Sequence, residues 1–295
     1  MRQERNEICS VLLLALALFT AAGAFAQSQG TQQQQPQQPT QGQQPPAGQK
    51  PAAPQAAPLT LDAAPPPVSA EEDAAMKSFR DVPVSEVEKK EQAGEDFVKK
   101  YPNSRYAAEV YGWLVKGYLN TGQVDKMEAA GDKELALAPD DAQTLAILGS
   151  TLPRAMNANT PDPEKRLAKA EEYCRKALDL MPALVKPANV SDENFQKAKS
   201  QASALAYSGL GLVAFRRGKF ADAIPQFEQA VKIDPTPDPV NYYLLGVSNQ
   251  KASHFDDAVA AFTKCAAIPG GLQVTCKGNI DEAKKLAATQ LSAPK

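Results

Sequence analysis

The sequence predicts an all-α fold, an α-solenoid built from antiparallel pairs of helices. Three observations support this prediction. Ala, Lys, Glu, Gln and Leu dominate after residue 69, and runs of β-branched residues are missing. Helix-start signals recur, so that about ten or eleven helices are expected between residues 69 and 290. The segment 210–235 is repeated in similar form 35 residues later, which is typical of repeat architectures.

The amino terminus has the order of a secretory signal peptide over residues 1–26. Arg2 and Arg5 precede the apolar stretch Val11–Ala22, and the small residues of "AFA" stand just before Gln27. We therefore expect cleavage before Gln27 and export to the periplasm or another part of the cell envelope. The alternative is an uncleaved anchor, but the apolar stretch is shorter than the roughly 20 residues that span a bilayer. After cleavage, no integral membrane segment is expected.

Residues 27–68 are rich in Gln and Pro, with almost no charge and few large apolar side chains. Such a segment buries too little surface to offset the entropy of ordering, so a disordered linker is predicted. It could act as a tether, as a proline-rich ligand or as a passive spacer. Residues 69–295 are then expected to form one helical repeat domain.

Several helix starts follow from local signals in this domain. "SAEE" at Ser69 and "SEVE" at Ser85 have the capping-box pattern. Asp162 precedes Pro163, and proline is favoured at the first helical position. Glu171 and Arg175 are four residues apart and should pair on a solvated face, as should Glu172 and Lys176. A longer helix is expected over 191–217.

The internal repeat specifies packing. Leu210–Gly211 corresponds to Leu245–Gly246, and further apolar and small residues recur at the same interval. Each unit is expected to be two antiparallel helices that bury their apolar faces only by stacking on neighbours. The recurring pairs are Phe220 and Phe255, Ala223 and Ala258, Phe227 and Phe262, and Ala230 and Cys265.

These residues resemble the tetratricopeptide repeat (TPR) family. The best unit matches at Tyr207, Leu210, Gly211, Gly218, Phe220, Ala223, Phe227, Ala230 and Pro235. The next unit departs at Ser253 and Gly270, where the family has glycine and proline. Residues 108–141 fit more loosely, because Met127, Gly131 and Glu134 depart from the motif. A further unit spans 142–183 with an insertion, so the resemblance covers most of 84–290.

The resemblance implies a non-catalytic protein-binding scaffold, in which the first helix of each unit lines a concave groove for a protein or peptide. For any single apolar member of this groove, ordinary core between helices is the favoured interpretation, whereas the polar members are expected to be exposed. Gly112, Ser208 and Tyr243 stand where a terminal-carboxylate clamp would need basic or amide groups, so that ligand is not expected. Mapped by motif position, the groove residues are Trp113, Lys116, Asn120, Leu205, Leu212, Phe215, Arg216, Tyr243, Val247 and Gln250.

Other classes of function find little support in the sequence. The 32 basic and 34 acidic residues nearly balance, which argues against a general electrostatic grip on nucleic acid. His254 is the only histidine, and no P-loop, G-x-S-x-G or metal-ligand spacing occurs. The adjacent carboxylates of Glu171 and Glu172 would point about 100° apart on a helix. No enzyme, catalytic residue, metal or cofactor is therefore predicted, and a structural envelope component without a peptide groove is the alternative.

The cysteines add one expectation. Export leaves Cys174, Cys265 and Cys276 in an oxidising compartment, where a disulfide can persist. Cys265 stands at the motif position of Ala230, on the face that meets the next helix, and "PGG" at 269–271 lets the chain turn back toward Cys276. A Cys265–Cys276 disulfide is predicted, with Cys174 left as a thiol in or near the core. The alternative is two buried thiols that pack like alanine.

Overall fold

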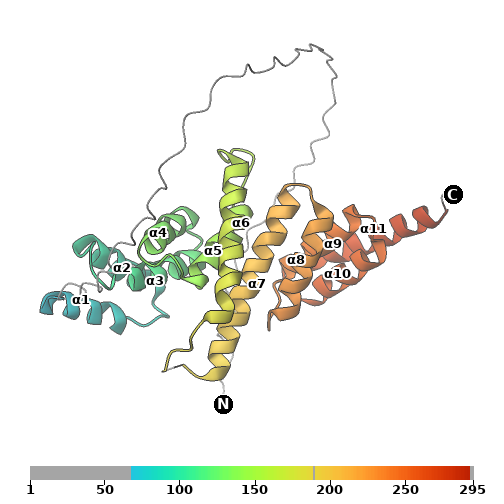
Figure 1. Ribbon diagram of the computed structural model, residues 1–295. Helices are drawn as coiled ribbons and strands as arrows, with labels where there is room; N and C mark the ends of the chain where they lie inside the picture. Colours follow the sequence, from blue (N-terminus) through green and yellow to red (C-terminus); the bar gives the residue numbers. More distant parts are fainter. Residues whose placement is uncertain (1–67, 189, 293–295) are drawn as a thin grey trace, which may run out of the picture. The chain divides into compact units, whose positions relative to one another are not determined.

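The computed structural model describes residues 68–188 and 190–292, and within these ranges the regular structure is helical, without a strand (Figure 1). The predicted all-α class is confirmed. Residues 1–26 and the predicted linker up to residue 67 lie outside the described residues. The helices are α1 (Ala70–Asp81), α2 (Val87–Lys100), α3 (Ala107–Asn120), α4 (Val124–Leu137), α5 (Ala142–Arg154), α6 (Pro163–Leu180), the 3₁₀ turn η1 (Met181–Ala183), α7 (Asp192–Arg216), α8 (Phe220–Ile233), α9 (Pro239–Lys251), α10 (Phe255–Ala267) and α11 (Gln273–Ser292).

Helices that follow one another in the sequence pack against one another, as an α-solenoid requires. The pairs α3–α4, α5–α6, α7–α8 and α9–α10 each form a repeat unit. Successive units meet where α5 contacts α7, α6 contacts α7, and α8 contacts α9. The last helix, α11, packs on α10. Each unit therefore covers an apolar face of its neighbour.

The predicted repeat appears as one packing contact made twice. A Cβ atom placed on Gly211 would lie 2.7 Å from the ring of Phe227, and one placed on Gly246 would lie 2.6 Å from the ring of Phe262. Both rings are fully buried. Glycine therefore lets the first helix of each unit lie directly on the aromatic ring of the second, and the 35-residue register predicted from the sequence is confirmed.

Helices α5, α6 and α7 come together closely at two glycines. A Cβ atom on Gly209 would lie 2.8 Å from the carbonyl oxygen of Gly149, and the sulfur of Cys174 occupies the space beside both. Cys174 is completely buried, and this burial raises the pKa of its thiol to about 12. The structure places Cys174 in the core as an unbonded thiol, as predicted.

Local signals set most helix starts, with one correction. The hydroxyl of Ser69 accepts the amide of Glu72 at 3.1 Å, as predicted. The prediction for Ser85 is wrong, because α2 begins one residue later with Glu86 in the cap position and no side-chain cap bond. The amide of Glu86 instead donates to the carbonyl of Pro83, which closes a turn ahead of the helix. Asp162 and Pro163 do begin α6, although the Asp162 side chain makes no cap bond.

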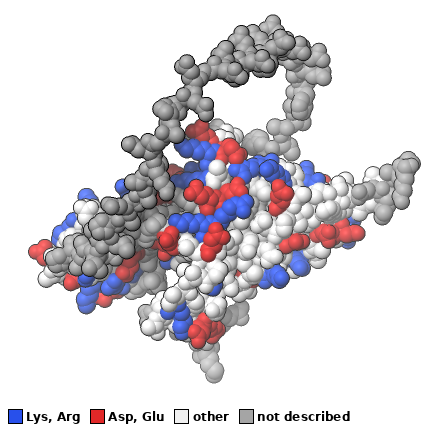
Figure 2. All heavy atoms as spheres, in the orientation of Figure 1, with Lys and Arg blue, Asp and Glu red and all other residues white. Residues whose placement is uncertain are grey.

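The two ion pairs predicted on α6 have different outcomes. Glu171 pairs with Arg175 at 2.7 Å, as predicted. Lys176, however, reaches Asp140 at 2.9 Å, so the predicted pairing with Glu172 is wrong. Asp140 precedes α5, so the lysine reaches outside its own helix. Figure 2 shows that side chains of both charges lie intermingled on this face of the molecule, so it presents no patch of one sign.

The turns between paired helices use left-handed backbone. Gly122 and Gly218 have φ of 72° and 71°, and Ser253, which replaces the glycine in the last complete unit, has φ of 65°. An L-residue in this conformation costs roughly 1–2 kcal/mol because its Cβ crowds the following carbonyl oxygen. Ser253 therefore carries local strain that Gly218 avoids.

We expect Ser253→Gly to raise the free energy of unfolding by about 0.5–1 kcal/mol, since relief of strain exceeds the added entropy of glycine in the unfolded chain. Gly218→Ser, at the matching turn one unit earlier, should lower it by a similar amount. Urea denaturation followed by circular dichroism measures both changes. Loss of stability on Ser253→Gly would contradict this account of the turn.

Candidate functional site

Helix α3 places the first predicted set of groove residues on one side. Trp113, Lys116 and Asn120 are spaced by three and four residues, so they lie along one face of the helix. Lys116 and Asn120 are exposed, whereas Trp113 is half-buried. The indole lies edge-on to the ring of Phe79 in α1, with 6.0 Å between the ring centroids. The aromatic member therefore joins α1 to α3 and still borders the surface.

A cleft of about 370 Å³ opens beside this face of α3. It lies among α1, α2, α3, the end of α4 and the cap of α5, and it includes two of the predicted groove residues, Trp113 and Lys116. The residues that line it are Phe79, Arg80, Val84, Lys90, Glu109, Gly112, Trp113, Lys116, Glu134 and Asp141. The cleft is thus lined by aromatic, cationic and anionic side chains together.

Lys90 closes one side of the cleft. Although it is a lysine, only 5% of its surface is exposed. Its Nζ donates to the carbonyl oxygens of Phe79 at 3.1 Å, Arg80 at 3.3 Å and Val82 at 2.6 Å. These carbonyls end α1, where the helix dipole favours a cation. Burial lowers the pKa of Lys90, although the nearby Asp81 opposes this. The ammonium group is committed to holding α2 against α1.

Arg80 and Glu109 bridge α1 and α3 at another part of the cleft. The guanidinium Nε and Nη2 donate to the two carboxylate oxygens at 3.0 and 2.7 Å. Such a two-bond arrangement fixes the geometry of both groups. Both side chains are about half exposed, so the pair adds little to stability. It does, however, neutralise two of the charges that border the cleft.

Glu134 is a buried carboxylate in the wall of the cleft, with 5% of its surface exposed. Thr144 of α5 donates to its Oε2 at 2.5 Å. Its Oε1 lies where a Cβ atom on Gly112 would be only 2.5 Å away, so glycine in α3 makes the space for it. Burial raises the pKa of Glu134 to about 7, and the charge of Asp141 adds to this rise. The bond from Thr144 and the charge of Lys116 act in the opposite direction.

The second predicted set, on α7, divides between core and surface. Leu212 has 5% of its surface exposed and belongs to the core, and Leu205 is partly buried between two apolar clusters. Phe215 lies edge-on to Phe220, with 5.4 Å between the ring centroids. Arg216 is exposed, and its Nη2 donates to the carbonyl oxygen of Met156 at 3.1 Å.

The third predicted set, on α9, is in contact with α11. Nε2 of Gln250 donates to Glu282 at 3.3 Å, and Val247 packs on the apolar cluster that includes α11. Tyr243 is 9% exposed, and burial raises the pKa of its hydroxyl. The charge of Glu282 adds to this rise, whereas a hydrogen bond with Asn279 acts against it. The structure thus brings Trp113 and Lys116 together in one cleft and places Tyr243 and Gln250 against the last helix.

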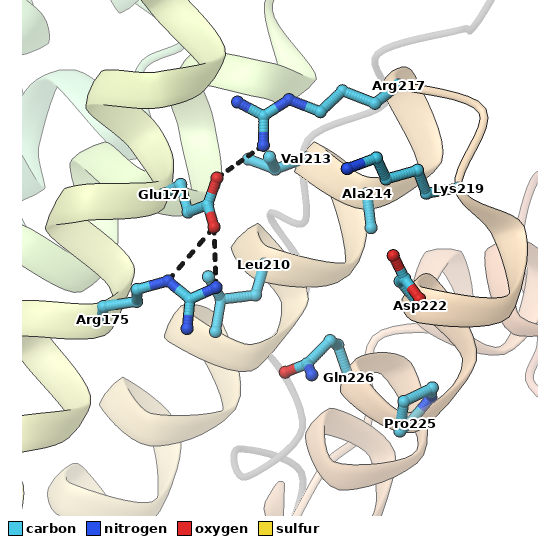
Figure 3. A pocket seen from close by; sticks show the side chains of 10 residues that line it. All are labelled: Glu171, Arg175, Leu210, Val213, Ala214, Arg217, Lys219, Asp222, Pro225 and Gln226. Carbon is cyan, nitrogen blue, oxygen red and sulfur yellow. Dashed lines mark hydrogen bonds and ion pairs between the residues drawn. The ribbon is translucent and has the colours of Figure 1, made fainter.

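A second hollow of about 370 Å³ lies among α6, α7 and α8 (Figure 3). Glu171 accepts bonds from Arg217 at 2.5 Å and from Arg175 at 3.1 and 2.7 Å, and these hydrogen bonds lower its pKa. Arg217 also contacts Glu164. A carboxyl group with a lowered pKa is a poor proton donor. Glu171, Arg175 and Arg217 thus satisfy one another and join two units, and Lys219, Asp222 and Gln226 line the rest of the hollow.

Sequence reasoning missed the buried charges of the first cleft. Lys90 gave no signal, because its carbonyl partners become neighbours only when α1 folds against α2. Glu134 did give one, since it stands at the small-residue position that Ala230 and Cys265 occupy in later units. Within the described ranges, no group of three or more His, Cys, Asp or Glu side chains could hold a metal ion. None of the helices there combines the length and apolar character needed to cross a membrane.

Fold and site together define an α-solenoid of helix pairs with a lined cleft on its first helices. The family profile described as "Tetratricopeptide repeat" matches residues 204–237, so this chain carries at least one such repeat. This is the unit whose sequence fits the repeat motif best, at Leu210, Gly211 and Phe227 among other positions. No curated protein matches the chain significantly.

Solved structures of low sequence identity are similar to this chain over about three quarters of its length. TTC0263, a thermophilic TPR protein from Thermus thermophilus, is 16% identical with a TM-score of 0.43, and the match covers 72% of this chain and 98% of that one. PilW, a type IV pilus biogenesis factor, is 17% identical with a TM-score of 0.46 over 74% and 90%. Yeast Tom70 is 15% identical with a TM-score of 0.41 over 74% and 39%.

The structure also joins the sulfur atoms of Cys265 in α10 and Cys276 in α11, whose Cα atoms are 5.9 Å apart. This separation lies within the range that a disulfide requires. Both residues are fully buried. A bond here would fasten α11, which covers Tyr243 and Gln250, to the unit before it. Formation of the bond in the protein itself stays a prediction.

We expect reduction of the Cys265–Cys276 bond to lower the free energy of unfolding by about 2–3 kcal/mol, because the bond restricts the unfolded chain. Cys265→Ala should lose stability by a similar amount and should not respond further to reductant. Thermal or urea unfolding with and without dithiothreitol gives these values, and mass spectrometry of a non-reduced digest identifies the bridge. Two unmodified thiols at Cys265 and Cys276 would disprove the pairing.

Proposed function

We propose that this protein is a non-catalytic scaffold of the cell envelope, which binds a protein or peptide partner in the groove of its repeats. The observation that carries this proposal is the cleft beside α3, where Trp113 and Lys116 border a hollow in the surface of a first helix. The TPR match at 204–237 supports it, because solenoids of this kind present extended binding surfaces. On α7, the exposed Arg216 would extend the contact.

A second candidate is a structural component of the envelope without a peptide groove. The contacts of Tyr243 and Gln250 with α11 favour it, because they remove two predicted groove residues from the open surface. On this alternative, partners would contact outer faces of the solenoid. The two candidates differ in which charged residues a partner needs.

Affinity purification of the full chain from its native cell, with crosslinking, tests the groove. The variant Arg216→Glu reverses an exposed charge on the first helix α7 and should reduce recovery of a partner by about tenfold, since a reversed charge opposes encounter and binding. Lys232→Glu, on the exposed side of the second helix α8, is the matched control and should recover the partner normally. Equal recovery with Arg216→Glu would favour the structural candidate.

The envelope location rests on the signal pattern of residues 1–26, and it has a separate test. We expect the native protein to begin at Gln27 and to fractionate outside the cytoplasm, because the order of charged, apolar and small residues directs export and cleavage. Amino-terminal sequencing of the purified native protein measures this. Retention of Met1 in a cytoplasmic fraction would contradict the proposal.

A further inference from the structure

Glu134 is a large charged residue at a motif position where the later repeat units have a small one. At the same motif position the later units have Ala230 and Cys265, which are small and fully buried. Here a glutamate extends from α4, the second helix, toward α3, the first helix. Gly112 omits the side chain that would block it, because a Cβ atom there would lie 2.5 Å from Oε1. The carboxylate therefore reaches the cleft on the groove side of the unit.

No cation forms an ion pair with this carboxylate in the described part of the chain. Lys90 gives its donors to three carbonyl oxygens, and Arg80 is held by Glu109. Lys116 is exposed and acts on Glu134 only through its charge, without a hydrogen bond. The hydrogen bond from Thr144 goes to Oε2, which leaves Oε1 beside the cleft without a donor.

A buried carboxylate without a counter-ion is costly, and a cation that reaches it is correspondingly well bound. Asp141 makes a bound cation still more favourable, since it lines the same cleft and its charge opposes ionisation of Glu134. The indole of Trp113 borders the same cleft, and the ammonium group of Lys90 already lies over its ring, 5.5 Å from the centroid. The cleft thus combines an unpaired anion with an aromatic ring in a hollow of about 370 Å³.

We propose that this cleft receives the arginine side chain of a peptide segment of the partner, with the guanidinium group on Oε1 of Glu134. The proposal rests on the proposed function, of which it specifies the chemistry of the ligand. Glu134 is the recognition residue, Gly112 provides its access, and Thr144 holds its other oxygen. Lys116, at the rim of the cleft, opposes entry of a second cation.

This arrangement makes binding dependent on pH. The groups around Glu134 are Gly112 and Lys116 on α3, Lys90 on α2, Asp141 at the cap of α5 and Thr144 on α5, with the Arg80–Glu109 pair further along the cleft. Burial raises the pKa of Glu134 to about 7, so about half of the sites are protonated at neutral pH. A cation binds the ionised form, so affinity should rise by about tenfold between pH 6 and pH 8 and level off above that.

The chain contains one tryptophan, Trp113, so its fluorescence reports on this cleft alone. The full chain is titrated with N-acetyl-L-argininamide, whose only charge is the guanidinium group. We expect a saturable change in emission that strengthens from pH 6 to pH 8. Glu134→Gln should weaken binding by at least about tenfold, whereas Lys116→Ala should strengthen it, because a competing charge is removed. Glu228→Gln, an exposed carboxylate on α8, is the matched control and should bind like the parent.

Three results would overturn the proposal: no saturable response to N-acetyl-L-argininamide, a response that is constant between pH 6 and pH 8, or tighter binding of N-acetyl-L-glutamate amide. The pH comparison uses the parent protein, so it tests the proposal even if the Glu134→Gln variant does not fold. Recovery of a groove partner together with no argininamide response would reject this site and leave the proposed function standing. Argininamide binding without recovery of any groove partner would support this site and reject the proposed function.

Discussion

The contact of a buried aromatic ring with a glycine on the paired helix is the constraint on which the solenoid depends. Phe227 lies on Gly211, and Phe262 lies on Gly246 in the same way one unit later. A side chain at either glycine would push the two helices apart and disturb the surfaces on which the next unit stacks. Because each unit buries its apolar face only against its neighbours, a local separation would spread along the array.

The first unit keeps the helix pair with a different set of side chains. Met127 is fully buried where later units have alanine, and Gly131 stands where they have phenylalanine, with the side chain of Leu148 packed against it. The volume removed at one position is thus restored at others, in agreement with the tolerance of cores for exchanges that conserve volume. The same freedom allows Glu134 to replace a small residue opposite Gly112. Of these departures from the repeat pattern, Glu134 is the one that lines the cleft.

The sequence predicts the parts of the structure that depend on local pattern or on the repeat. The class, the long helix α7, the 35-residue register and the burial of Phe227 all follow from spacing. Contacts that depend on how distant helices meet were not predictable. The three carbonyls around Lys90 belong to a neighbouring helix and the turn after it, and the cover that α11 gives Tyr243 depends on the path of the chain after Pro269. Motif position identifies a first-helix face, but only the packed structure distinguishes Trp113 at the cleft from Leu212 in the core.

The close packing around Cys174 has a consequence for the motions of the molecule. Its sulfur lies against Gly149 and Gly209 with no exposed surface, so an alkylating reagent can reach it only when α5, α6 and α7 separate. The reaction rate of this thiol therefore measures how often the middle of the solenoid opens, in the way that hydrogen exchange reports local unfolding. Because the sulfur is small and already in place, the protein carries a probe of its own breathing at the point where two repeat units meet.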